Sequence, residues 1–128
     1  MGDVVQVEPY GKPALAALIA NGQSLSAEID LGGCELLGIH VPAGFDGTAL
    51  TFQAAEKTGG TFLNVFTSGG TELSLTVAAS RYVVPATDDA LASLRGMGRY
   101  IKVRSGSSGT PTNQTDDSTL RLIVKQGG

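Results

Sequence analysis

The sequence has few of the residues that most catalytic and metal sites require. Its 128 residues include one cysteine, one histidine and no tryptophan. The lone Cys34 cannot form a disulfide within the chain, and Cys34 with His40 cannot supply the four ligands of a structural zinc site. No Gly-x-Ser-x-Gly segment accompanies His40, which lies on an apolar stretch. We therefore expect no enzymatic activity, no catalytic residue, no metal site and no cofactor.

Charged residues and long apolar runs are also scarce. Charged residues make up 16% of the chain, and the formal net charge is -3, which disfavours nucleic acid as a main partner. The longest apolar run, residues 14–20, is far shorter than the roughly 20 residues of a membrane-spanning helix. Asp3 stands where a secretory signal would carry basic residues. We expect no membrane partner, a chain that begins near Met1, and assembly in a reducing cytoplasm.

Small residues are abundant instead. The chain has 18 glycines, 12 threonines and 10 serines, a composition typical of turn-rich β proteins. Apolar and polar residues alternate in many short runs, which is the period of a half-buried strand. The runs cover residues 24–31, 36–41, 50–55, 73–78, 99–105 and 119–125, and residues 62–66 and 82–84 are expected to be further short strands. Residues 14–20 form a further strand, although their alanines and leucines also fit a helix.

This spacing predicts an all-β fold, a jelly-roll-like β-sandwich of about eight or nine strands with one short helix. An up-and-down barrel is the alternative, because the pattern does not determine strand order. The helix is expected over residues 87–96, where Thr87 can cap its start and Gly96 its end. Residues 14–128 form one domain. Its predicted core is Leu25, Ile29, Leu36, Ile39, Leu50, Phe52, Leu73, Leu75, Val77, Ile101, Val103, Leu120, Leu122 and Val124.

Two segments are expected to meet partners. Residues 1–13 are predicted to be an extended N-terminal arm, whose Val4, Val5, Val7 and Tyr10 are candidate contact residues. An extra edge strand of the same domain, or a frayed terminus, would fit the same residues. Residues 106–118 form a polar stretch without an apolar anchor, which we expect to be a mobile or partner-contacting loop.

Basic and acidic clusters suggest two weaker hypotheses. Arg99, Lys102 and Arg104 are candidate partner contacts on one strand. If that strand lies beside residues 119–125, the bases Arg121 and Lys125 would join them in a groove for a single nucleic-acid strand, although few aromatics are present to stack bases. The pairs 88–89 and 116–117 are adjacent aspartates, but neither lies in a calcium-loop pattern.

Four stretches carry a family resemblance. They are residues 50–55 (LTFQAA), 59–61 (GGT), 80–83 (SRYV) and 99–106 (RYIKVRSG). Together they resemble small β-sandwich virion proteins of tailed bacteriophages, over roughly residues 23–125. Some sugar-binding discoidin-like modules share the cadence of LTFQ followed by GGT. The resemblance implies no particular binding residue, because its motifs are strand and turn patterns.

The resemblance implies a non-enzymatic structural role. We expect a capsid decoration, or cement, protein that binds the outside of the shell as a homo-oligomer, stabilises coat subunits, and is assembled in the host bacterial cytoplasm. Its partner would be the major capsid protein or another virion protein. The alternative is a tail, neck or surface adhesin that binds a glycan through loops at one end of the sandwich.

Overall fold

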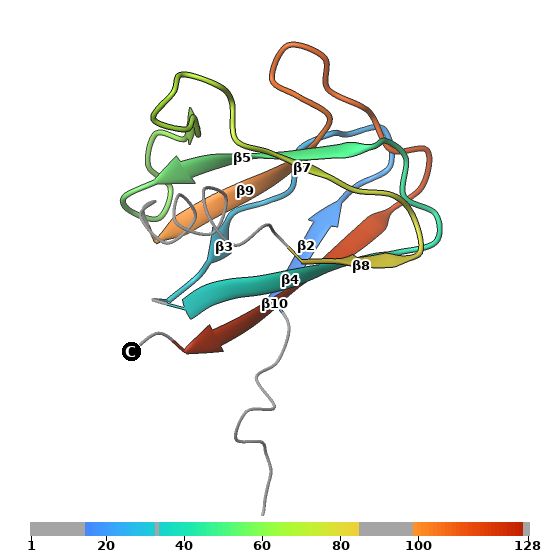
Figure 1. The fold of residues 1–128 in the computed structure, drawn as a ribbon, viewed down its shortest axis with the longest axis horizontal. Coiled ribbons are helices and arrows are strands. Elements are labelled where there is room, and N and C mark those ends of the chain that lie inside the picture. Colours follow the sequence, from blue (N-terminus) through green and yellow to red (C-terminus); the bar gives the residue numbers. More distant parts are fainter. Residues whose placement is uncertain (1–14, 33, 85–98, 127–128) are drawn as a thin grey trace, which may run out of the picture.

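The computed structural model describes residues 15–32, 34–84 and 99–126 (Figure 1). These residues form strands and no helix, which confirms the all-β prediction. The predicted arm at 1–13 and the predicted helix at 87–96 lie outside the described residues. The strands are β2 (Leu15–Ile19), β3 (Ile29–Asp30), β4 (Cys34–Val41), β5 (Ala49–Ala55), β6 (Leu63–Asn64), β7 (Ser74–Thr76), β8 (Arg81–Val83), β9 (Tyr100–Ser105) and β10 (Ser118–Gln126).

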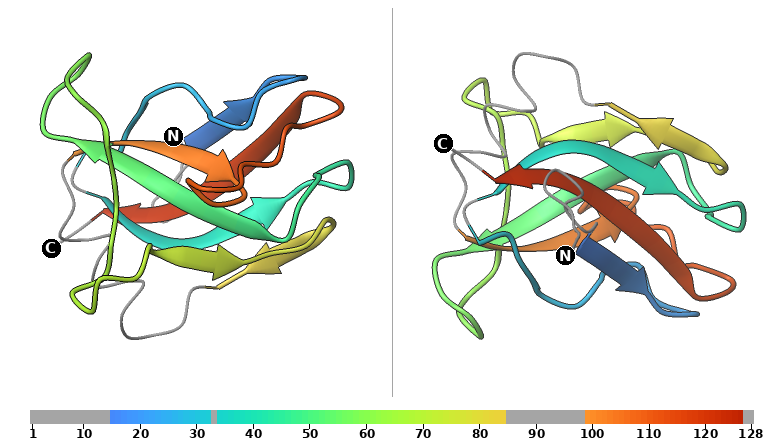
Figure 2. Two further views of the ribbon diagram at one scale, coloured as in Figure 1. Left: turned by 90° about the horizontal axis from the view of Figure 1, so that it is seen from above. Right: turned by 90° about the horizontal axis from the view of Figure 1, so that it is seen from below.

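The strands form two antiparallel sheets. Sheet I has the order β2-β10-β4-β8. Sheet II has the order β3-β9-β5-β6, and β7 pairs with the part of β5 that β6 leaves free. The two sheets face each other as the layers of a sandwich (Figure 2). Within the segment 14–20, for which a helix was the alternative, Leu15–Ile19 forms strand β2, which lies at the edge of sheet I among the described strands and pairs with β10.

A single apolar core fills the space between the sheets. Every predicted core residue is buried except Leu25, which is half-buried. The core is larger than predicted, since it also contains Ala17, Ile19, Leu31, Val41 and Phe45. Alternation is a reliable guide on these strands because successive side chains point to opposite faces of a sheet.

The predicted strand at 24–31 is wrong over most of its length, since only Ile29–Asp30 is strand. Ser26 is buried and Ala27 is exposed, the reverse of the predicted alternation. The backbone N–H of Ser26 donates to the carbonyl of Val103 (2.8 Å), and the Ser26 hydroxyl accepts from the N–H of Val103 (2.9 Å). The hydroxyl thus replaces a backbone acceptor, which turns Ser26 inward.

A β-bulge in sheet I explains a change of phase in β4. Leu36 and Ile39 are both buried, although an odd number of steps separates them. In the register with β10, Val124 lies opposite Leu36 and Ile123 lies opposite Gly38, so Leu37 is an extra residue. The bulge keeps Leu36 in the core and leaves Leu37 44% exposed on the outside.

The polar loop at 106–118 is held by a polar anchor. Gln114 is 1% exposed. Its side-chain amide donates to the carbonyl of Asp46 (2.8 Å) and its Oε1 accepts from the N–H of Asp46 and the hydroxyl of Ser118 (both 2.9 Å). The loop lacks an apolar anchor, as predicted, but a buried amide with satisfied hydrogen bonds fixes its C-terminal part to residue 46; its contact with a partner stays a prediction.

Candidate binding surfaces

The predicted contact residues fall in different surroundings. Val4, Val5, Val7 and Tyr10 lie outside the described residues. Arg99 immediately precedes β9, and Lys102 and Arg104 lie on it. Tyr100, Lys102 and Arg104 share the face of sheet II that points away from the core, because they alternate with the buried Ile101 and Val103.

Arg104 is buried on this outer face, with 9% of its side chain exposed. Its guanidinium donates to Oδ1 of Asn64 (2.8 Å), to the hydroxyl of Thr51 (3.3 Å) and to Oε2 of Glu72 (3.3 Å). The other carboxylate oxygen of Glu72 accepts from the backbone N–H of Ser108 (3.1 Å). Arg104 therefore links β9 to β5, to β6 and to the segment that precedes β7, and its charge is paired with that of Glu72.

Arg99 is exposed but engaged. Its Nε and one terminal nitrogen donate to the two carboxylate oxygens of Asp30, at 2.7 and 3.0 Å. This hydrogen-bonded pair lowers the pKa of Asp30 and raises that of Arg99. The guanidinium also lies 5.4 Å from the centroid of the Tyr100 ring. Arg99 thus fastens β3 to the start of β9 and presents a neutralised pair to solvent.

Lys102 is half-buried and lies against an aromatic ring. Its Nζ is 4.6 Å from the centroid of Phe62, within the range of a cation–π interaction. The predicted groove of bases does not form, because β9 belongs to sheet II and β10 to sheet I. Arg121 is therefore exposed on the opposite side of the sandwich from Lys102.

A surface that sequence reasoning missed covers the outer face of sheet I. One row of paired residues crosses all four strands of this sheet: Ala16, Arg121, His40 and Tyr82. Tyr82, at one end of the row, is 72% exposed, and two exposed leucines lie beside the row, Leu18 at 47% and Leu37 at 44%. The outer face of sheet I is defined here by Ala16, Leu18, Leu37, His40, Tyr82, Arg121 and Ile123. Part of its signal was available in the sequence, since Ile123 is a large apolar residue on the side of its strand opposite the predicted core residues Leu122 and Val124.

His40 lies in the middle of this face. Its ring packs edge-on against Tyr82, with centroids 5.1 Å apart. Among the described residues its Nδ1 is buried without a hydrogen-bond partner. The residues opposite His40 in register are Arg121 and Tyr82, so the histidine sits between a cation and a phenol. That arrangement differs from the serine and carboxylate neighbours of a hydrolytic histidine.

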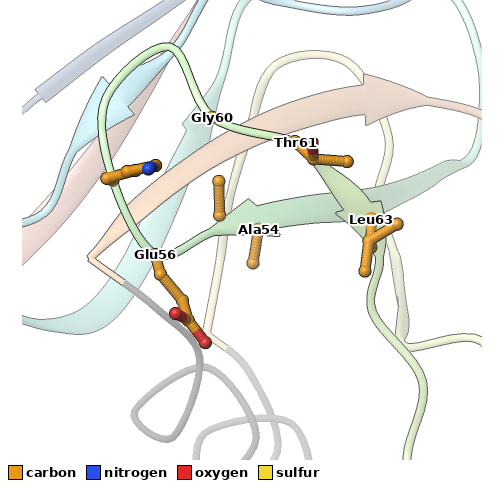
Figure 3. A pocket seen from close by; sticks show the side chains of 7 residues that line it. Ala54, Glu56, Gly60, Thr61 and Leu63 are labelled. Carbon is orange, nitrogen blue, oxygen red and sulfur yellow. The ribbon is translucent and has the colours of Figure 1, made fainter.

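An open hollow of about 370 Å³ lies where β5 turns into β6 (Figure 3). Ala54, Ala55 and Leu63 give it an apolar wall, and Glu56 and Lys57 add one charge of each sign. Leu63 is 68% exposed. The hollow can hold a small apolar group of a ligand beside two charged ends.

The acidic residues of the described segments do not gather into a metal site. No group of three or more His, Cys, Asp or Glu side chains is placed to hold an ion within these segments. Oδ1 of Asp117 accepts from the backbone N–H of Asn21 (2.8 Å), which gives this aspartate a structural role. Asp88 and Asp89 lie outside the described residues. Within the described chain no helix is long and apolar enough to span a membrane.

The chain matches no protein-family model, no curated protein and no solved structure.

Proposed function

We propose that the chain is a non-enzymatic virion structural protein, a capsid decoration protein that binds the outside of the shell and stabilises coat subunits. The observation that carries the proposal is the outer face of sheet I. It exposes Leu18, Leu37 and Tyr82 around Arg121, on four paired strands that hold them in fixed positions. Exposed apolar groups around an arginine are the composition of a protein-binding surface, because aromatic side chains and arginine are enriched in such interfaces.

The strand order supports a jelly-roll version of the sandwich. Consecutive strands alternate between the sheets at most connections, from β2 in sheet I to β3 in sheet II, then to β4 and β5, and again through β8, β9 and β10. A double Greek key has this kind of crossing, and virus capsid domains are among the proteins that use it. Because lectins use it too, the fold supports a binding role without deciding the ligand.

The proposed partner is the major capsid protein or another virion protein, and the proposed location is the virion, after assembly in the cytoplasm of a bacterial host. A protein of this kind acts in many copies, each of which adds a small buried interface to the shell. Binding to the assembled coat but not to its unfolded subunits would stabilise the coat by mass action.

Purified phage particles and particles assembled without this protein provide the test. We expect the protein to bind the latter at a copy number comparable with that of the coat subunit and to raise the temperature at which they release DNA. Tyr82→Ser and Leu37→Ser should weaken binding. The matched control is Phe66→Ser, because Phe66 is 53% exposed but belongs to the sheet II side of the molecule. Equal loss with all three variants, or no binding at all, would contradict the proposal.

The second candidate is a tail, neck or surface adhesin that binds a glycan. The hollow beside β6 supports it, because the exposed Leu63 and two alanines form an apolar wall beside the charged ends of Glu56 and Lys57. The apolar face of a sugar ring packs on this wall while its hydroxyls bind the charged ends. Glycan-array binding that Leu63→Ser abolishes, together with a few copies per particle, would favour this candidate over the first.

A further inference from the structure

The outward edge of β2 differs from every other sheet edge in the described part of the chain. β3 and β6 have two residues each, and β7 and β8 have three. β2 has five, and all of them pair with β10 in unbroken register on one side. Among the described residues, no strand pairs with its other side. Of the sheet edges that the structure describes, β2 therefore presents the longest row of backbone N–H and C=O groups for pairing.

This edge also lacks the features that protect exposed strands. Proteins block such edges with charges, prolines, bulges or very short strands. The sequence of β2 is LAALI, which has no charge and no proline, and its pairing shows no bulge. By contrast β3 carries Asp30 and β8 carries Arg81. An unprotected edge of this length is suited to pairing with another strand.

The chain that enters β2 supplies a strand of matching length. Residues 4–8 are VVQVE, in which Val5 and Val7 alternate with Gln6 and Glu8. Pro9 and Pro13 follow, and each biases the residue before it toward an extended conformation. Fourteen extended residues span about 46–50 Å, more than three times the radius of gyration of about 14 Å expected for this domain size.

We propose that residues 4–8 of one copy pair with the outward edge of β2 in a neighbouring copy. The proposal deepens the proposed function, because it names the contact that links copies on the virion, and it rests on that multi-copy role. The pairing places Val5 and Val7 on the side of Ala17 and Ile19, which face the core, and Gln6 and Glu8 on the side of Ala16 and Leu18. It extends sheet I by one strand donated from outside.

The first test blocks the edge in the full chain. Leu18→Lys adds a charge to the edge strand, on a side chain that is already 47% exposed, so the core is undisturbed. The matched control is Leu37→Lys, which places the same charge on the same face, at a 44% exposed leucine of the inner strand β4. Sedimentation velocity should show self-association of the original chain, weakened at least about tenfold by Leu18→Lys and little by Leu37→Lys.

Two results of this test would overturn the proposal. A chain that stays monomeric over the whole concentration range has no linking contact. Equal weakening by Leu18→Lys and Leu37→Lys would show that copies meet through the face of sheet I and not through the edge of β2. A circular dichroism spectrum of each variant shows whether its fold is intact.

The second test separates pairing between copies from pairing within one chain. In a Cys34→Ser background, one protein carries Val5→Cys and a second carries Ala17→Cys. Mixing the two under mild oxidation should give a disulfide-linked heterodimer. A chain that carries both substitutions and closes a disulfide only within itself would overturn the proposal, because residues 4–8 would then cover their own β2.

The readouts also separate this inference from the proposed function. Both tests use the purified protein without particles. A truncation that removes residues 2–12 should abolish self-association and weaken particle binding, because copies then bind one by one. Self-association through β2 without any particle binding would contradict the decoration role but not the edge pairing. Particle binding by a chain that stays monomeric would contradict the edge pairing but not the decoration role.

Discussion

Phe52 is the largest side chain that the sandwich buries completely. It lies opposite Val103 in the middle of sheet II and points into the core. Replacing Phe52 by Ala should lower the free energy of unfolding by about 3–5 kcal/mol, because the lost ring leaves a cavity that the rigid sheets cannot close. Urea unfolding followed by circular dichroism measures the change.

Phe66→Ala is the control for this prediction. Its ring is 53% exposed, so its removal should change the free energy of unfolding by less than about 1 kcal/mol. Equal costs for the two variants would mean that Phe52 does not occupy the centre of the core.

Arg104 and Glu72 form a partly buried pair whose members depend on each other. Arg104→Ala leaves the Glu72 carboxylate, which is only 15% exposed, without its cation. We expect a loss of about 3 kcal/mol in the free energy of unfolding, because an unpaired buried charge is costly. The double variant Arg104→Met with Glu72→Leu should recover much of that loss. Additive costs in a double-mutant cycle would exclude the coupling.

The sequence predicts these residues unequally well. Alternation identified Phe52 as a core residue because the rule depends only on its immediate neighbours. The same rule assigned Arg104 to the solvent face of its strand, which is the correct face but the wrong environment. Its burial comes from Glu72 and Asn64, which are 32 and 40 residues away in the chain. Alternation along a strand depends only on neighbouring residues in the sequence, so it cannot predict contacts between residues this far apart.

In the loop at 106–118, the stability of the protein is expected to depend on the side chain of Gln114. Gln114→Ala removes the acceptor of the Asp46 N–H and of the Ser118 hydroxyl, and both groups lie in partly or fully buried surroundings. The free energy of unfolding should fall by about 2–4 kcal/mol, because two polar groups lose their partners. Hydrogen exchange should accelerate first at residues 112–118. Unchanged exchange there would mean that Gln114 is not the anchor.

The strands were predicted correctly where one face packs on the core and the other does not. β5, β7, β9 and β10 agree with the alternation because one face of each lies on the core. Residues 24–28 departed from it because the Ser26 hydroxyl made a hydrogen bond that a backbone carbonyl would otherwise make. The bulge at Leu37 was hinted at by the spacing of Leu36 and Ile39, but only the partner strand shows where the extra residue lies.

The whole molecule is expected to lose stability in acid. Hydrogen bonds from the backbone and hydroxyl of Thr115 lower the pKa of Asp46 below its ordinary value of 3.8, and the backbone of Gly59 with the hydroxyl of Thr58 lowers that of Glu28 below 4.5. A lowered folded-state pKa stabilises the protein fully above the ordinary value, and this contribution is lost as the pH falls through the folded-state pKa. The melting temperature should therefore drop below about pH 5.

Asp46→Asn tests the assignment. The variant should melt at a lower temperature near neutral pH and lose less on acidification than the original chain. Asp116→Asn is the matched control, since Asp116 is an exposed aspartate at the same end of the sandwich. Identical acid profiles for the original chain and Asp46→Asn would contradict the prediction.

Chelation should leave the whole molecule unaffected. Treatment with EDTA is expected not to change the melting temperature, because neither pair of adjacent aspartates lies in a calcium-loop pattern. A fall of several degrees that added calcium reverses would show that an aspartate pair, at 88–89 or 116–117, binds a metal.

For the whole molecule, the fold class could be predicted from the sequence, but the order of the strands in the two sheets could not. Runs of alternation and turns were enough for an all-β sandwich. The pairing of β10 with β4 and β2, rather than with β9, was not predictable, because both basic strands have the same local pattern. That one topological fact removed the predicted groove and placed Arg121 on the outer face of sheet I.

The pairing of β2 with β10 joins nearly the two ends of the described chain, with Leu15 opposite Leu122 and Ile19 opposite Ser118. On the ribosome, β2 is made before every other strand that the structure describes and must wait for the last of them, β10, before its partner is available. Such long-range closure lowers the folding rate, because much chain entropy is lost before the contact forms. Until then the apolar LAALI segment is open to contact with chaperones or with other nascent chains. A truncation before Ser118 would leave this segment without its partner permanently, so we expect prematurely terminated chains to aggregate and be degraded.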